Sequence, residues 1–430
     1  GEFLATGSGI LQLMEDAGEA LAGNGEVLLL GGGNPARIPE VQRAFREAMG
    51  SLLDDAPRFD RIVGDYDGPQ GNAEFLSAIT GLLNSQFNWG ISENNVALTN
   101  GSQTSFFVLF NMFAGTNRDG QEQRILLPLI PEYIGYTEMG LGKCIFDTCK
   151  PSITLSGDHQ FKYHVDFEHL QLHSHTSALC VSRPTNPTGN VLTDAEIEQL
   201  DVLATERDLP LIIDGAYGTP FPNIIFTDAT PFWDSNIILC LSLSKLGLAG
   251  VRTGIVIAHE DIIQSIKSAN AILNLTPGSF GPGLTTDMVR DGSILEISNQ
   301  FIRPFYQSRA EIAINWLESE LAGYPFRVHT PEGAIFLWLW FKDLPITSEM
   351  LYQRLKARDV LVIPGEHFFP GLTEPWKHRH ECIRVSYAQD QQTVERGIAI
   401  IAEEVRAAYD GAAPYTPDIQ RHSTRSASLR

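Results

Sequence analysis

The sequence Ser242-Leu243-Ser244-Lys245-Leu246-Gly247-Leu248-Ala249-Gly250-Val251-Arg252 places a lysine among hydroxyl groups and glycines, directly after the apolar segment 236–243. A lysine that loses its proton can form a Schiff base with an aldehyde, and hydroxyls with a nearby arginine can hold a phosphate. A lysine on a loop is more commonly a solvated side chain. The stretch alone leaves both interpretations open, and other segments decide between them.

Two further segments suit an aldehyde cofactor built on a pyridine ring, namely pyridoxal phosphate (PLP). Asn186-Pro187-Thr188-Gly189 follows the strand-like run 177–181. The Pro and Gly fit any turn, but the Asn186 amide is a suitable donor to a phenolate oxygen. The buried-strand pattern 211–214 ends in Asp214, which can keep the pyridine nitrogen protonated, although a strand-end Asp often only caps a helix. Tyr217 could donate a second hydrogen bond to the phenolate.

Phosphate and ring contacts are suggested by two other strand ends. Gly101, Ser102 and Gln103 lie between the strand-like 95–98 and the helix-like 104–113, where unpaired N–H groups can receive a phosphate. Tyr133 follows the strand-like 124–129 and offers an aromatic ring to stack on the pyridine, with core packing as the alternative.

One arginine stands inside an apolar strand near the end of the sequence, in Cys382-Ile383-Arg384-Val385-Ser386-Tyr387. A buried arginine is costly unless it is paired. The bidentate carboxylate of a substrate is therefore a suitable partner for Arg384.

The order of these motifs resembles that of the class I and II aminotransferases of PLP fold type I, over nearly the whole chain. The motifs are Gly-Ser-Gln, Pro-x-Tyr, Asn-Pro-Thr-Gly, Asp-x-Ala-Tyr, Ser-x-Ser-Lys, a following Arg and the late strand Arg. The subfamily of bacterial valine–pyruvate aminotransferases is similar through segments 30–35, 100–103, 183–190, 331–338 and 364–370.

The resemblance implies a role for each candidate residue. Lys245 would be the Schiff-base lysine and proton shuttle, Asp214 the partner of the pyridine nitrogen, and Asn186 with Tyr217 the partners of the phenolate. Tyr133 would cover the ring. The phosphate would be held by Gly101, Ser102, Gln103, Ser242, Ser244 and Arg252, with Tyr66 reaching it from the partner subunit of a homodimer. Arg384, the Gly33 backbone and Asn186 would bind the substrate carboxylate.

Two positions depart from the family pattern. Gly215 stands where most relatives place Glu or Asn, and we expect it to remove a side chain close to the cofactor; Ala249 stands where Pro is usual. An aminotransferase acting on small neutral amino acids and 2-oxo acids is the expected activity. Gly215 keeps open a PLP-dependent lyase, replacement or C–C bond-forming enzyme that acts at Cβ or Cγ of a larger amino acid. A regulator of the same fold is disfavoured, because the sequence shows no pattern of a DNA-binding extension.

The pattern of apolar runs predicts an α/β protein of PLP fold type I. At 430 residues the chain exceeds the usual size of a single core. Strands alternate with helical stretches, which predicts a large domain around a mostly parallel mixed sheet, over 56–290. A smaller α+β domain is expected over 291–410, with 1–55 contributing to it and 411–430 as a flexible tail.

Composition limits the partners. The formal net charge of -21 argues against nucleic acid. No apolar run approaches a membrane span and no signal-peptide pattern is present, so we expect no membrane partner and a cytoplasmic enzyme. The five cysteines suit a reducing compartment. The alternation His378-x-His380-x-Cys382 could supply metal ligands, but a solvated segment before a strand is favoured, and no metal is expected.

Overall fold

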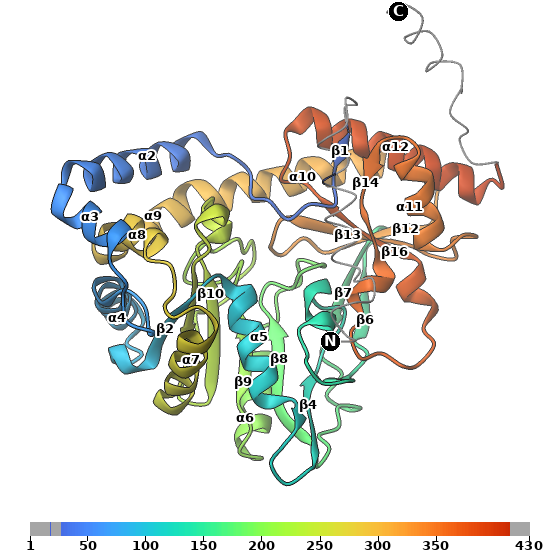
Figure 1. The fold of residues 1–430 in the computed structure, drawn as a ribbon. Coiled ribbons are helices and arrows are strands. Elements are labelled where there is room, and N and C mark those ends of the chain that lie inside the picture. Colours follow the sequence, from blue (N-terminus) through green and yellow to red (C-terminus); the bar gives the residue numbers. More distant parts are fainter. Residues whose placement is uncertain (1–17, 19–26, 413–430) are drawn as a thin grey trace, which may run out of the picture.

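The computed structural model describes residue 18 and residues 27–412. The expected flexible tail 411–430 therefore lies outside the described residues from position 413 onward. Two sheets form the centres of two adjoining regions of the molecule (Figure 1). A third, two-stranded pairing joins β1 (Leu28–Leu29) to β14 (Val360–Leu361) in parallel, so the start of the described chain is attached to the C-terminal region.

The first sheet is mostly parallel, as predicted. Its order is β2-β11-β10-β9-β8-β4-β3, with β5 also paired to β4. Neighbours from β10 through β9 and β8 to β4 and β5 run parallel, whereas β11 is antiparallel to both of its neighbours. The strands are β2 (Val96–Thr99), β3 (Gly115–Thr116), β4 (Glu122–Leu127), β5 (Phe146–Thr148), β8 (Thr176–Ser182), β9 (Leu211–Asp214), β10 (Ile237–Ser242) and β11 (Gly254–Ile257).

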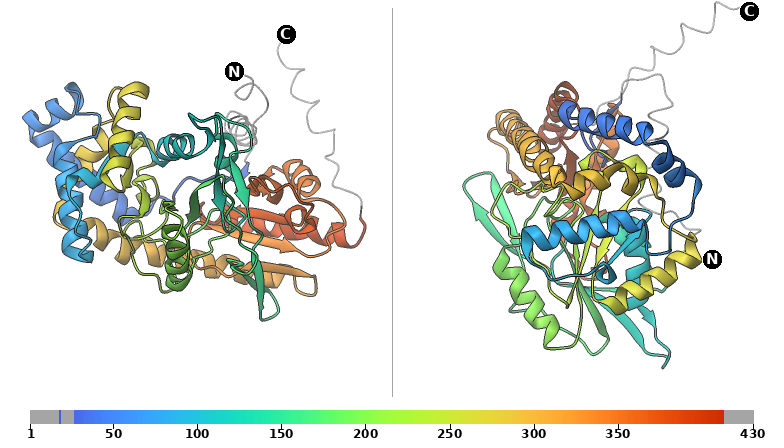
Figure 2. Two further views of the ribbon diagram at one scale, coloured as in Figure 1. Left: turned by 90° about the horizontal axis from the view of Figure 1, so that it is seen from below. Right: turned by 90° about the vertical axis from the view of Figure 1, so that its left-hand side faces the viewer.

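Helices flank this sheet and explain why its strands are apolar on both faces. Every residue of β2, β10 and β11 is buried, which is typical of a sheet covered on two sides. Figures 1 and 2 show the layered arrangement. The helices of this region are α3 (Ala56–Gly64), α4 (Ala73–Phe87), α5 (Ser102–Phe113), α6 (Asp194–Thr205), α7 (Glu260–Leu273) and α8 (Phe280–Arg290).

The second sheet is larger than the sequence indicated. Its order is β15-β16-β13-β12-β7-β6. The hairpin of β6 and β7 comes from within 56–290, yet β7 pairs in parallel with β12. The expected domain boundaries remain a prediction, but this hairpin shows that the second sheet draws on distant parts of the chain. The strands are β6 (Ser152–Ser156), β7 (Gln160–His164), β12 (Phe326–His329), β13 (Phe336–Phe341), β15 (Ile363–Pro364) and β16 (Cys382–Ser386).

A long helical stretch connects the two regions. It consists of α9 (Ser293–Ile297), a π-helical turn at Ser298–Ile302 and α10 (Arg303–Glu320). The remaining helices are α2 (Pro39–Asp54), α11 (Ser348–Lys356) and α12 (Gln391–Tyr409). None of the described helices is both long and apolar enough to cross a bilayer.

Candidate functional site

Lys245 stands where β10 ends, in a short 3-10 turn over Ser244–Leu246. Its Nζ donates a hydrogen bond to the Gly33 carbonyl at 2.6 Å, and lies 5.1 Å from the centre of the Tyr217 ring. Burial, together with the positive charges of Arg384 and Arg252, lowers the Lys245 pKa to about 8. Neutral amine is therefore accessible near physiological pH, as a nucleophile or base requires.

Asp214 ends the neighbouring strand β9, and its carboxylate is held by two donors. The Ala216 N–H contacts Oδ1 at 2.9 Å and the Tyr136 hydroxyl contacts Oδ2 at 2.8 Å. Burial raises the Asp214 pKa, while these hydrogen bonds and the Lys245 charge oppose that shift. Tyr136 was not singled out from the sequence. Its position three residues after Tyr133 was the available signal.

Arg384 lies in β16 and brings Asn186 into the same cluster. Its guanidinium donates to Asn186 Oδ1 at 2.6 Å and to the Gly31 carbonyl at 2.7 Å, and its Nε has no partner among the described residues. The Cζ atom lies 3.9 Å from the ring centre of Phe336 and 5.1 Å from that of Phe368. Burial lowers the Arg384 pKa to about 10. The arginine is thus positioned to take a carboxylate in an aromatic environment.

A cradle for an anion forms at the start of α5. Gly101 has a φ of 90°, and a Cβ there would lie 2.2 Å from the Arg252 guanidinium, so only glycine allows this approach. Arg252 also donates to Ser244 Oγ at 3.5 Å. The first N–H groups of α5, which begins at Ser102, have no partners within the helix. Gln103 lines an adjacent cavity of about 470 Å³.

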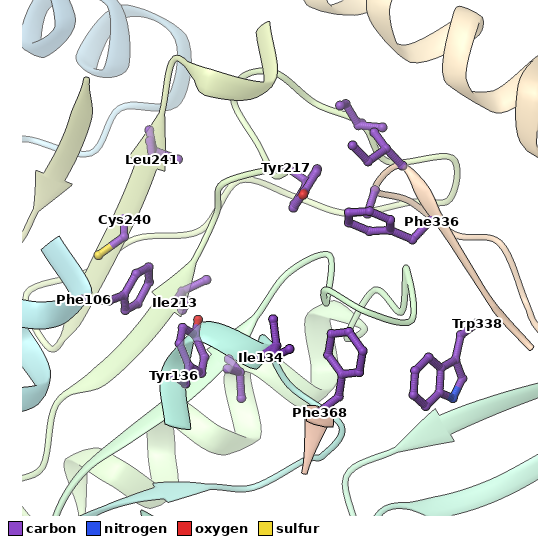
Figure 3. Packing of buried hydrophobic residues seen from close by; sticks show 14 of the residues in the cluster. Phe106, Ile134, Tyr136, Ile213, Tyr217, Cys240, Leu241, Phe336, Trp338 and Phe368 are labelled. Atoms are coloured by element: carbon purple, nitrogen blue, oxygen red, sulfur yellow. The ribbon is translucent and has the colours of Figure 1, made fainter. Parts of the chain in front are cut away.

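Aromatic rings from both regions border the cluster. Tyr217 and Phe336 meet with ring centres 6.0 Å apart, and Tyr133 packs edge-on against Tyr136 at 5.6 Å. Figure 3 shows Tyr217, Phe336 and Phe368 at the junction of the two sheets, with the Tyr136 hydroxyl directed toward the strand of Ile213.

Two predicted residues are placed differently from the rest. Tyr66 is 82% exposed and does not join the cluster within one chain. Ser242 is buried; its Oγ donates to the Thr253 carbonyl at 3.3 Å and accepts the Ser244 N–H at 3.1 Å. Its hydroxyl shapes the lysine turn, and its contact with a phosphate stays a prediction.

The expectation about Gly215 was wrong. A Cβ at this position would meet Leu241 Cδ2 at 2.9 Å and Leu239 Cδ1 at 3.2 Å, two side chains on one face of β10. Asp214 is paired instead with Cys240, the residue between these leucines, whose side chain is on the other face. Since side chains alternate along a strand, the missing side chain of Gly215 would point to the face opposite Asp214. The absence of a side chain at Gly215 therefore does not widen the space next to Asp214. The argument from Gly215 for an enzyme acting at Cβ or Cγ of a larger amino acid loses its basis.

The histidine segment before β16 is solvated only in part, and two of its three side chains meet, with His378 Nε2 3.7 Å from Cys382 Sγ. His378 is buried, with its ring 4.7 Å from that of Trp376, whereas His380 contacts Glu366 at 2.5 Å. Among the described residues, no group of three His, Cys, Asp or Glu side chains is arranged to hold a metal ion.

The donor set fits PLP. Lys245 offers an amine of lowered pKa, Asp214 a buried carboxylate, and Arg384 an unpartnered Nε. The absence of a Cβ at Gly101 lets the Arg252 guanidinium approach the start of α5, where it can pair with a phosphate.

Comparisons with known proteins agree with this geometry. The sequence model described as "Aminotransferase class I and II" matches residues 29–401. The valine–pyruvate aminotransferase of Escherichia coli K12 is 50% identical over 409 residues, covering 95% of this chain and 98% of the relative.

Two solved structures are similar over nearly their full length. A putative amino-acid aminotransferase from Psychrobacter arcticum 273-4 shares 46% identity with a TM-score of 0.92, covering 95% of this chain and 98% of that one. The valine-pyruvate aminotransferase from Salmonella typhimurium LT2 shares 48% identity with a TM-score of 0.86, covering 93% and 99% respectively.

Proposed function

The chain belongs to the class I and II aminotransferases. We propose that it exchanges amino groups between small neutral amino acids, such as valine, and 2-oxo acids, such as pyruvate. Its cofactor is PLP, which when bound supplies an aldehyde that takes up the amino group and a ring that stores electrons released at the substrate Cα. The valine–pyruvate aminotransferase of Escherichia coli, which is 50% identical in sequence, supports this choice of substrates.

Each residue of the cluster has a defined task in this proposal. Lys245, with a pKa near 8, removes the proton from the substrate Cα and returns it elsewhere in the same reaction. Asp214 stays ionised and holds the proton on the pyridine nitrogen. Asn186 uses its Nδ2 donor toward the phenolate, since its Oδ1 is occupied by Arg384. The Gly101–Arg252 cradle and the start of α5 hold the phosphate.

The contacts of Arg384 indicate which class of substrate the site accepts. This arginine can bind the α-carboxylate, and the side chains that flank it are the aromatic rings of Phe336 and Phe368. A second carboxylate on the substrate side chain would be placed against apolar rings without a cation of its own. Burying an unpaired charge is costly, so acidic amino acids are disfavoured and small apolar ones accepted.

Steady-state transfer from single amino acids tests this proposal. With pyruvate as acceptor for valine, 3-methyl-2-oxobutanoate as acceptor for alanine and either one for 2-aminobutyrate, each small donor should exceed aspartate, measured with the same acceptor, in kcat/KM by about a hundredfold, the effect of a few kcal/mol. Arg384→Lys should raise KM for every donor, because the bidentate fork is lost. Cleavage at Cβ or Cγ of a larger amino acid, with no transfer from any small one, would contradict the proposal.

We also propose a homodimer in which Tyr66 completes the partner's phosphate site. Thr276 Oγ1 donates to the Gly68 carbonyl at 3.1 Å, so the segment after α7 lies beside the loop that carries Tyr66. Exposed apolar side chains lie on or next to these two segments, namely Val63 near the end of α3, Ile272 near the end of α7 and Leu275 directly after α7. Such a surface favours a second copy. Light scattering should give twice the chain mass, and Tyr66→Phe should weaken cofactor binding; a fully active monomer would exclude shared sites.

We propose the cytoplasm as the compartment. All five cysteines are free in the structure, and a reducing environment keeps them so. Recovery of the active enzyme from a periplasmic extract would contradict this.

A further inference from the structure

A second buried carboxylate lies next to the Asp214 site and has no part in the functions above. Glu132, directly before Tyr133, is fully buried. Its Oε1 accepts the Ser182 N–H at 2.8 Å and its Oε2 contacts the Ser182 hydroxyl at 2.5 Å. No lysine or arginine of the described chain forms an ion pair with it. A buried carboxyl without a cation favours its neutral form.

The contacts continue from Glu132 to Asp214. Ser182 Oγ lies 3.4 Å from the Tyr136 hydroxyl, which in turn lies 2.8 Å from Asp214 Oδ2. The three supporting residues come from different segments: Glu132 from the loop after β4, Ser182 from the end of β8, and Tyr136 from the 3-10 turn Ile134–Glu138. The fold therefore aligns four oxygen-bearing side chains in one buried row.

The protonation state of Glu132 decides how this row is oriented. When the acid carries its proton, its O–H can donate to Ser182 Oγ, which frees the serine hydrogen for Tyr136. Every donor then points toward Asp214, and hydrogen bonds in such a chain strengthen one another. When Glu132 is ionised, the hydroxyl hydrogen of Ser182 turns to the Glu132 carboxylate. The hydrogen bond that Ser182 donated to the Tyr136 oxygen is then lost. Burial raises the Glu132 pKa to about 8, so the protonated orientation prevails at neutral pH.

We propose that protonated Glu132 is a positioning residue that acts through Ser182 and Tyr136 to hold Asp214 ionised and correctly oriented. The inference rests on the proposed role of Asp214 beside the pyridine nitrogen. The titratable groups that face Glu132 are Tyr133, Tyr136, Cys180 and Asp214. Burial raises the pKa of the two tyrosines and of Cys180 above values that are already alkaline, so these groups keep their protons where Glu132 loses its own.

Four variants of the holoenzyme test the relay. Tyr136→Phe and Ser182→Ala interrupt it, so kcat should fall about tenfold while KM for valine changes less than twofold, and the Kd for PLP should rise severalfold. Glu132→Gln should keep kcat and Kd within about twofold, because an amide N–H donates to Ser182 permanently, as the protonated acid does. Glu381→Gln is the control, since Glu381 is also a buried carboxylate that accepts the Asp343 N–H at 3.0 Å and the Trp340 indole N–H at 2.9 Å, but it lies directly before β16 and is paired with Lys377.

The pH profile separates this role from mere support of the fold. In the wild type, kcat should decline as Glu132 ionises above about pH 8, and in Glu132→Gln that decline should disappear, whereas Glu381→Gln should keep it. The relay is overturned if Glu132→Gln loses as much kcat as Tyr136→Phe, if Ser182→Ala matches the wild type, or if the alkaline decline persists in Glu132→Gln. Failure of the proposed function would instead show as absent amino transfer in the wild type.

Discussion

At the scale of single residues, the site depends on charged side chains that are shielded from water and have few hydrogen-bond or ion-pair partners. Lys245 has a lowered pKa because it is buried beside Arg384 and Arg252. Burial raises the pKa of Asp214, while its two hydrogen bonds and the Lys245 charge oppose that shift and favour the ionised form. The chemistry of proton transfer thus follows from placement, since lysine and aspartate by themselves titrate far from neutrality.

The residues proposed to hold the cofactor could be singled out from the sequence, but those behind them could not. Lys245, Asp214 and Arg384 stand at or within apolar strands, where a charged residue is conspicuous, and the structure brings all three together. Glu132 and Tyr136 stand in a loop and a turn, and their contacts with Ser182 and Asp214 depend on how two strands end side by side. The error about Gly215 has the same origin, because the sequence does not reveal to which face a strand-end side chain points.

At the scale of elements, the first sheet could be predicted because its strands are short, apolar and separated by helices. The second sheet could be predicted only in part. Strand β6 is exposed or half-buried, β7 alternates the buried Phe161 and Tyr163 with half-buried residues, and both lie some 160 residues or more from β12, with which β7 pairs. Pairing between such distant segments leaves no local signal in the composition.

Two buried histidines, His329 in β12 and His378 in the turn before β16, make stability depend on pH. Burial lowers the pKa of His329 and of His378 to about 3. The unfolded chain takes up these protons near pH 6.5, so below that pH the unfolded state binds more protons and stability falls by at most about 1.4 kcal/mol per pH unit for each histidine. Above about pH 6.5 their contribution is fully present.

Thermal unfolding at several pH values measures this effect. In the holoenzyme Tm should drop between about pH 6.5 and about pH 4.5, and His378→Gln should make that drop shallower because one of the two protonation sites is gone. The exposed His173 provides the control, as His173→Gln should leave the slope unchanged. An identical slope in wild type and His378→Gln would show that the buried ring does not limit acid stability.

At the scale of the whole molecule, the site exists only where the two regions meet. Lys245 and Asp214 come from the first sheet, Arg384 and Phe336 from the second, and Gly33 from the segment after β1. The Glu132 N–H donates to the Phe368 carbonyl at 2.9 Å, which adds a backbone link between the regions. Long-range assembly of this kind explains why motif order in the sequence could indicate the family, while the geometry required the fold.

The most direct test of the central claim is the identification of the lysine that carries the cofactor. Sodium borohydride reduces a Schiff base to a stable amine, so peptide mass analysis of the reduced holoenzyme should find the pyridoxyl group on Lys245 alone. Lys245→Ala should bind PLP without a reducible bond and transfer no amino group. A pyridoxyl group on another lysine, or a reducible and active Lys245→Ala enzyme, would contradict the account.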